Sequence, residues 1–223
     1  MHSAYVFDAY GTLFDVHAAV RRHADAVGPD ATQLSDVWRT KQLEFTWTRT
    51  MMGRYVDFWD LTKQALDYAF EKFPDANKSS KNQLLDAYWE LECFAEVPAV
   101  LRSLKEAGVR TGILSNGSSG MLEAAVKSAG ITDLVDNVIS VDRINVFKAM
   151  PEVYQMVVDD FRLYPDAVSF QSSNRWDVAA AANFGFRAVW CNRGNQPDEY
   201  KDMSPELVLA DLNGLIGTNG KPV

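Results

Sequence analysis

The chain has 223 residues, of which 47% are apolar and 23% are charged, a composition typical of a soluble globular protein. Its net charge is -8, and it has no basic face or block of like charge, so we expect no nucleic-acid partner. No run of 18 apolar residues occurs, and no basic segment precedes the first apolar stretch. We therefore expect neither a membrane partner nor a signal peptide, and predict a cytoplasmic protein.

The first predicted element is a short buried strand, AYVFD, at residues 4–8. From Val16 to about Cys93, apolar residues recur at helical spacing with no strand signal among them. Ser79 and Ser80 are predicted to cap the last of these helices. The helical segments are VHAAVRRHADAVG (16–28), QLSDVWRTKQLEFTWTRTM (33–51), YVDFWDLTKQALDYAFEKF (55–73) and NQLLDAYWELE (82–92).

After Glu96 helices and strands alternate. The predicted order is helix 97–108, strand 109–115, helix 119–130, strand 137–141, helix 151–161, strand 167–172, helix 176–186, strand 187–192 and a final apolar segment at 207–215. Gly108 is a typical helix-stop residue. This spacing predicts βαβ units and a parallel sheet, so the fold class is α/β. The helical block is then an insertion between the first strand and the rest of the sheet.

Polar residues follow the predicted strands. Ligands bind beyond the carboxyl ends of the strands in an open parallel sheet. The candidate functional residues are therefore Asp8, Ser115 with Asn116, and Ser172 with Asn174 and Asp177.

Asp8 can be interpreted in two ways. It can cap the turn formed by the residues that follow it, or it can be a nucleophile. A carboxylate is ionised at pH 7 and, unlike a serine hydroxyl, needs no base to activate it. Gly11 and Thr12 would allow backbone N–H groups and a hydroxyl to approach the carboxylate.

Four segments resemble the motifs of the haloacid dehalogenase superfamily. They are FDAYGTLFD (7–15), ILSNGS (113–118), Lys148 within VFKAMPEVY (146–154) and SSNRWD (172–177). The resemblance implies a Rossmann-like core formed by residues 1–15 and 95–223, and a helical cap domain formed by residues 16–94. Most members of this superfamily are Mg²⁺-dependent phosphatases that carry a second Asp two positions after the nucleophile.

Two acids that such a phosphatase uses are missing. Tyr10 stands at the position of the second Asp, and SSNRWD offers only Asp177 where phosphatases usually have two acids. Mg²⁺ prefers several hard oxygen ligands, and it neutralises phosphate charge in phosphoryl transfer. Halide is a good leaving group that needs neither a metal nor a proton. We therefore expect no metal and no cofactor. The alternatives are a Mg²⁺-dependent phosphatase that manages with Tyr10, and a binding protein that has lost its chemistry.

The chain resembles the (S)-2-haloacid dehalogenase branch over nearly its whole length. The matching segments include YGTLFDVHA, WRTKQLEFTWTR, LSNGS, VFK and SSNRWDVAAAANFGF. The resemblance implies hydrolysis of short (S)-2-haloalkanoic acids to (R)-2-hydroxy acids through an ester on Asp8. Members of this branch are commonly homodimers, so a homodimer is expected. The implied catalytic residues are Asp8, Thr12, Arg39, Ser115, Lys148, Tyr154, Ser172, Asn174 and Asp177.

The resemblance also assigns substrate contacts. Arg39 and Asn116 would receive the halide. Ser115, Lys148 and the backbone N–H groups around Ala9 and Tyr10 would hold the substrate carboxylate. An apolar pocket around the carbon chain would be lined by Gln42, Leu43, Phe58 and Trp176. Such aromatic residues are more often plain core, Tyr154 could be only a packed aromatic, and a helical Arg such as Arg39 is by itself more often solvated.

Three residues depart from the pattern of that branch. Ala149 follows the lysine where many relatives have Pro, and Gln171 interrupts an apolar strand end. Arg175 stands between Asn174 and Trp176 where a small residue is usual. Arg175 could lie on the surface, or it could change the charge near the mouth of the site.

Overall fold

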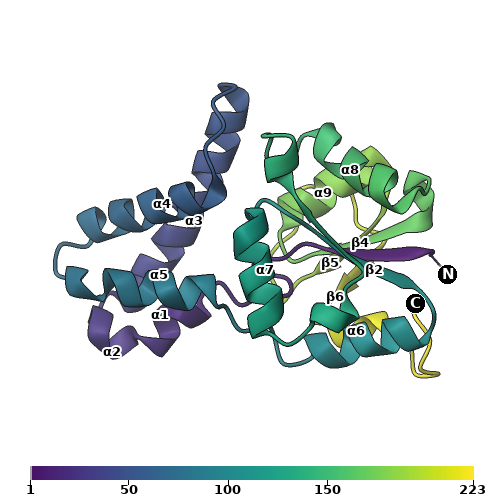
Figure 1. The fold of residues 1–223 in the computed structure, drawn as a ribbon, viewed down its shortest axis with the longest axis horizontal. Helices are drawn as coiled ribbons and strands as arrows, with labels where there is room; N and C mark the ends of the chain where they lie inside the picture. The colour runs from purple at the N-terminus through teal and green to yellow at the C-terminus, as the bar shows by residue number, and fades with distance from the viewer. Residues whose placement is uncertain (1) are drawn as a thin grey trace.

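The computed structural model describes residues 2–223 and contains a six-stranded parallel sheet (Figure 1). The strand order is β3-β2-β1-β4-β5-β6, and every neighbouring pair is parallel. The strands are β1 (Ala4–Phe7), β2 (Arg110–Ser115), β3 (Asn137–Ser140), β4 (Val168–Ser172), β5 (Arg187–Cys191) and β6 (Leu207–Leu209). The predicted α/β class with a parallel sheet is confirmed.

Helices cover both faces of this sheet. In Figure 1, α8 (Pro151–Phe161) and α9 (Arg175–Phe184) lie on one face, and α6 (Val97–Glu106) lies on the other. All residues of β1 and β4 are buried. Burial on both faces explains why β1 appears in the sequence as a continuous apolar run, whereas β4 also buries the polar side chains of Ser169, Gln171 and Ser172. Gly108, just beyond α6, has a φ of 75° and ends that helix as predicted.

The chain between β1 and α6 is helical and lies to one side of the sheet (Figure 1). Its helices are α1 (Ala18–Arg22), α2 (Ala24–Val27), α3 (Ala31–Met51), α4 (Phe58–Lys72) and α5 (Lys81–Trp89). No strand occurs between β1 and β2 in the part of the chain that the structure describes. The predicted helical insertion after the first strand is present, while its domain boundaries at residues 16 and 94 stay a prediction. We call residues 16–94 the cap.

Two helix boundaries in the cap differ from the prediction. The segment 16–28 forms two short helices that meet at His23, where no glycine or proline marks the break. Helix α4 begins at Phe58 rather than Tyr55, because the Asp57 side chain accepts a hydrogen bond from the Trp59 N–H at 2.7 Å. This contact is a typical N-cap, and it sets the first turn of the helix.

The predicted serine caps of α5 are wrong. Ser80 stands at the N-cap position, but its hydroxyl donates to the Asn77 carbonyl at 2.7 Å and makes no capping hydrogen bond. Asn77 is the residue that caps, because its side-chain oxygen accepts from the Ser79 N–H at the start of a short 3₁₀ turn. The capping side chain therefore lies before the predicted serines, at the start of the 3₁₀ turn that precedes α5.

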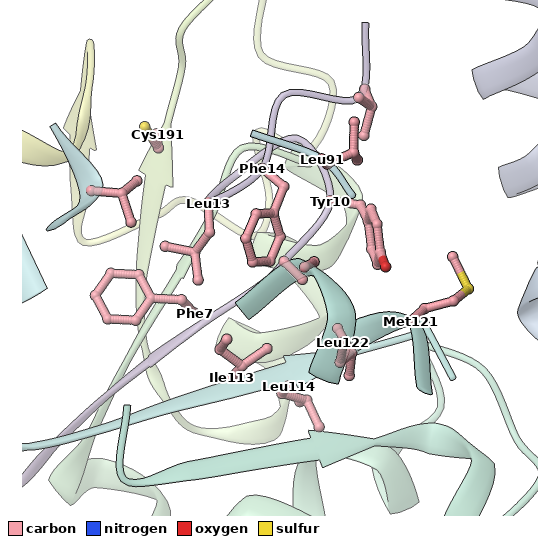
Figure 2. Packing of buried hydrophobic residues seen from close by; sticks show 14 of the residues in the cluster. Phe7, Tyr10, Leu13, Phe14, Leu91, Ile113, Leu114, Met121, Leu122 and Cys191 are labelled. Carbon is pink, nitrogen blue, oxygen red and sulfur yellow. The ribbon is translucent and has the colours of Figure 1, made fainter. Parts of the chain in front are cut away.

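One continuous apolar cluster joins the sheet to the cap. Figure 2 shows part of this cluster, with Leu13, Phe14 and Tyr10 turned toward side chains of β2 and α7 (Ser119–Ser128). The residues directly after β1 thus pack in the core while the chain leaves for the cap. None of the helices described between residues 2 and 223 combines the length and hydropathy that a membrane span requires.

Candidate active site

Asp8 lies at the carboxyl end of β1, between β2 and β4, and its side chain is 9% exposed. Its Oδ2 accepts hydrogen bonds from Asn174 Nδ2 at 2.7 Å, Thr12 Oγ1 at 2.9 Å and Ser172 Oγ at 3.3 Å. Its Oδ1 accepts one, from Lys148 Nζ at 3.0 Å. Four side chains from three separate segments therefore fix the carboxylate, and Oδ1 is the less occupied oxygen.

Lys148 is shared between two carboxylates. Its Nζ lies 3.0 Å from Asp8 Oδ1 and 2.8 Å from Asp177 Oδ2, and its side chain is 1% exposed. The other oxygen of Asp177 accepts the Tyr154 hydroxyl proton at 2.6 Å. The hydroxyl of Tyr154 thus contacts the site, and its ring is also a packed aromatic, because it lies against Phe170.

Burial and charge act in opposite directions on these groups. Burial lowers the pKa of Lys148, but the carboxylates of Asp177 and Asp8 outweigh burial, so the pKa lies above its ordinary value. Burial raises the pKa of Asp177, and Lys148 offsets only part of this rise. The ammonium therefore stays charged at neutral pH, and Asp177 accepts a proton more readily than an exposed aspartate does.

Arg39 reaches this site from α3 in the cap. Its Nη2 donates to the Tyr10 carbonyl at 3.0 Å and to Asn174 Oδ1 at 3.3 Å, and its Nη1 donates to Gln42 Oε1 at 2.7 Å. The amide of Asn174 thus links Arg39 to Asp8, with its oxygen toward the guanidinium and its nitrogen toward the carboxylate. The structure places a cation of the cap one side chain away from the candidate nucleophile.

Two predicted contact residues have local partners. The Asn116 side-chain oxygen accepts from the Lys148 backbone N–H at 2.9 Å, and Ser115 Oγ accepts from the Gly117 N–H at 3.0 Å. Both residues are buried at the end of β2. The backbone N–H groups of Ala9 and Tyr10 make no hydrogen bond within residues 2–223, so two donors beside Asp8 remain available to an anion.

The Tyr10 ring packs between core and cap. It stacks on Tyr88 with centroids 5.7 Å apart and an interplanar angle of 6°, and it also contacts Phe58 and Phe14. Burial raises the pKa of the Tyr10 hydroxyl well above its ordinary value. The buried hydroxyl therefore gives up its proton less readily than the hydroxyl of an exposed tyrosine does.

Gly117 lies directly against this ring. A Cβ at Gly117 would stand 2.6 Å from Tyr10 Cε2, closer than atoms can pack. We expect Gly117→Ala to lower the free energy of unfolding by about 1–3 kcal/mol, because the stacked ring cannot shift freely.

Gly120→Ala is the matched control, since a Cβ there meets nothing closer than 3.7 Å. Gly120 lies in α7, where alanine is expected to raise the free energy of unfolding by roughly 0.5–1 kcal/mol. Urea unfolding of both variants measures the difference. Equal stability of the two would contradict the steric argument.

A cavity of about 540 Å³ opens beside Arg39 and Asn174. Leu43 and Trp176 line this cavity, whereas Gln42 and Phe58 do not. Gln42 is 1% exposed and holds Arg39, and Phe58 packs against Tyr10 and Phe147. The structure therefore gives Gln42 a contact inside the cap, and gives Phe58 contacts between the cap and the core, rather than a place in the cavity wall.

Of the three residues that depart from the expected pattern, the structure gives specific contacts to Arg175 and Gln171 but not to Ala149. Arg175 is 5% exposed, and its Nε donates to Asp198 Oδ1 at 2.7 Å. Its Nη2 donates to the carbonyls of Tyr200 and Met203, so it fastens the segment after β5 to α9. Gln171 is buried and donates to Ser169 Oγ. Ala149 follows Lys148 through a cis peptide bond, and nothing in the structure explains the choice of alanine.

The sequence interpretation missed one residue that supports the site. Arg193 Nη2 donates to the Thr12 carbonyl at 2.9 Å and pairs with Glu96, and its guanidinium stacks on Phe94. It therefore braces the loop that carries Thr12. Arg193 comes two residues after the end of β5, and this position beyond a strand end is a signal that could have found it.

Comparison with known proteins agrees with this geometry. The family model of the haloacid dehalogenase-like hydrolases matches residues 2–185. A solved structure of a dehalogenase is 42% identical with a TM-score of 0.94, and the alignment covers 96% of this chain and 95% of that one. The L-2-haloacid dehalogenase of Xanthobacter autotrophicus with chloropropionic acid covalently bound is 36% identical with a TM-score of 0.84, over 96% of this chain and 97% of that one.

Curated relatives give a narrower assignment. (S)-2-haloacid dehalogenase 1 of Pseudomonas sp. strain CBS-3 is 47% identical over 95% of this chain and 94% of its own length. (S)-2-haloacid dehalogenase 4A of Burkholderia cepacia is 45% identical over 89% of this chain and 86% of its own length. With the buried Asp8, Lys148 and Asp177 at the carboxyl edge of the sheet, the chain belongs to the (S)-2-haloacid dehalogenase family of haloacid dehalogenase-like hydrolases.

Proposed function

We propose that this chain hydrolyses short (S)-2-haloalkanoic acids to (R)-2-hydroxyalkanoic acids and halide. The observation that carries the proposal is the Asp8 carboxylate, whose Oδ2 is held by three donors while Oδ1 faces only Lys148. A carboxylate fixed in this way presents one oxygen for attack. The likeness to a dehalogenase with chloropropionic acid covalently bound supports the same chemistry.

In the first step, Asp8 Oδ1 attacks C2 of the substrate from the side opposite the halogen. A C–O bond forms, the carbon–halogen bond breaks with its electron pair, and the configuration at C2 inverts. The substrate carboxylate is held by Ser115, Lys148 and the N–H groups of Ala9 and Tyr10. Arg39 and Asn116 receive the halide. Fixing the two reactants in line can supply roughly 7–11 kcal/mol of the barrier.

In the second step, water attacks the carbonyl carbon of the Asp8 ester. The ester C–O bond within the Asp8 side chain breaks, the hydroxy acid leaves with its C2–O bond intact, and one proton is released. Asp177 accepts that proton, and its raised pKa supports this role. Asn174 and Lys148 position the water, while Thr12, Ser172 and Tyr154 hold the two carboxylates. One water is consumed for each halide released.

The phosphatase alternative is not favoured. The position between Asp8 and Asp177 is taken by the Lys148 ammonium, 3.0 and 2.8 Å from their oxygens. A magnesium ion needs several oxygen ligands at about 2.0–2.1 Å, and a buried ammonium between the two acids opposes a second cation. Tyr10 also leaves phosphate chemistry without its general acid.

Assembly and location are further parts of the proposal. We propose a homodimer, because the end of α3 carries the exposed side chains of Met51 and Met52 next to the partly exposed Trp47. Light scattering is expected to give twice the mass of one chain.

We propose a cytoplasmic location, with which the free thiols of Cys93 and Cys191 are consistent.

Halide release from the two enantiomers of 2-chloropropionate tests the function. We expect release from the (S) form, no measurable release from the (R) form, and the same rate with EDTA present. Chiral chromatography should identify (R)-lactate as the product. Hydrolysis of p-nitrophenyl phosphate that requires Mg²⁺, without halide release, would replace this proposal with the phosphatase.

A further inference from the structure

Arg39 is useful as a halide acceptor only if its guanidinium keeps one orientation. Two of its acceptors, the Tyr10 carbonyl and Asn174 Oδ1, belong to the core. The third, Gln42 Oε1 at 2.7 Å, lies one turn away on the same helix and makes the shortest of the three contacts. Gln42 can present either its oxygen or its NH₂ group, since the two ends of a carboxamide have the same shape. What fixes the carboxamide therefore fixes Arg39.

The carboxamide of Gln42 is enclosed in the cap. Gln42 is 1% exposed, and its Nε2 donates to Thr62 Oγ1 at 2.7 Å. The Tyr88 hydroxyl lies 3.1 Å from Nε2 and 3.2 Å from Oε1. Tyr88 can accept from the nitrogen or donate to the oxygen, so it stabilises the carboxamide without choosing its direction.

Thr62 makes that choice. Its hydroxyl donates to the Phe58 carbonyl at 2.8 Å, which uses its single proton. Towards Gln42, Thr62 Oγ1 can then only accept, so the NH₂ group of Gln42 must face Thr62 and the oxygen must face Arg39. With the carboxamide reversed, an NH₂ group would face a guanidinium and an oxygen would face a lone pair.

We propose that Thr62 is a positioning residue that sets the orientation of Arg39 through the carboxamide of Gln42; this rests on the proposed function. Thr62 is fully buried on α4, and its carbonyl accepts from Trp38 Nε1 at 2.8 Å. It does not line the cavity beside Arg39. Its role is carried by a hydrogen-bond chain, Phe58 carbonyl to Thr62 to Gln42 to Arg39.

Thr62→Val tests this chain, because valine keeps the shape of threonine and removes only the hydroxyl. We expect the single-turnover rate of halide release from (S)-2-chloropropionate to fall roughly tenfold or more, the effect expected if the Gln42–Arg39 hydrogen bond, whose donor is charged, is lost as a consequence. The rate with (S)-2-bromopropionate should fall less, since bromide leaves with less assistance. Thr62→Ser keeps the hydroxyl and should restore both rates.

Thr46→Val is the matched control. Thr46 is also fully buried in the cap, and its hydroxyl donates to the Leu43 carbonyl without touching Gln42. It should leave the chloride-to-bromide rate ratio unchanged. If Thr62→Val does not fold, Thr62→Ala removes the same hydroxyl and serves in its place. A ratio in Thr62→Val or Thr62→Ala equal to that of Thr46→Val would overturn the proposal.

A second readout separates this proposal from the proposed function. Hydrogen exchange of the Gln42 side-chain NH₂ group, followed by NMR, should be slow in the parent and in Thr62→Ser. It should be fast in Thr62→Val. A parent protein that releases no halide would refute the proposed function, whereas slow exchange that persists in Thr62→Val would refute the hydrogen-bond chain itself.

Discussion

Replacement of Asp8 by asparagine is expected to abolish dehalogenation, with a loss of at least about 10⁴-fold in the single-turnover rate. A neutral carboxamide is a poor nucleophile. Its NH₂ group would also have to face either the Lys148 ammonium or the donors Asn174, Thr12 and Ser172. Asp25→Asn, at an exposed position of the cap, should retain the parental rate.

Isotope labelling identifies the attacking oxygen. In a single turnover in ¹⁸O-water, the label should enter the Asp8 side chain, because water attacks the carbonyl carbon of the ester and not C2. Mass spectrometry of the peptide that contains Asp8 measures this. Label found directly in the lactate, with none on Asp8, would mean that water displaces the halide and that Asp8 acts as a base.

Replacement of Lys148 by methionine is expected to cost about 3–5 kcal/mol of unfolding free energy, the usual loss when one partner of a buried ion pair is removed. Lys148 lies between Asp8 and Asp177, and all three are at most 6% exposed. The variant would bury two carboxylates with no cation between them. For a chain of this length the melting temperature should fall by roughly 6–20 °C, and turnover should be lost as well.

The pH dependence of Lys148→Met separates charge from packing. Lys148 opposes the rise in the pKa of Asp177 that burial causes, so its removal raises that pKa further. An acid whose pKa is higher in the folded state binds protons more tightly there, so stability increases as pH falls through that value. The difference in unfolding free energy between Lys148→Met and the parent should therefore become smaller from pH 7 to pH 5. A constant deficit would point to lost packing alone.

Two further variants complete the comparison. The double variant Lys148→Met with Asp177→Asn has the same net charge at positions 8, 148 and 177 as the parent. It should therefore be more stable than Lys148→Met alone. Lys63→Met removes an exposed lysine that pairs with Asp60 and should change stability by less than about 0.5 kcal/mol. Denaturant unfolding of the three variants tests the set.

Much of the fold could be predicted from the sequence, because its rules are local. Buried parallel strands such as AYVFD appear as apolar runs, and the helices between them keep a regular apolar spacing. The carboxyl ends of neighbouring parallel strands meet at one edge. Asp8, Ser115 and Ser172 can therefore be assigned to the same edge from their positions in the sequence alone.

The parts that could not be predicted depend on contacts between distant segments. The break at His23 has no local signal, and the role of Asn77 as a cap depends on a 3₁₀ turn. The contact between Arg39 and the Tyr10 carbonyl joins residues from the cap and the core. Thr62 sits on a buried helix face that the sequence marks only as apolar. Its importance follows from the fact that its hydroxyl already donates its single proton to the Phe58 carbonyl.

Tyr10 has a consequence for how the two chemistries of the superfamily are separated. Its carbonyl holds Arg39 and Asn174, while its ring fills the junction between the sheet and the cap. The ring at this position thus packs the sheet against the cap, at the place where the resemblance to the phosphatases puts a second acid. Introducing an acid there would remove the packing of that junction in the same step.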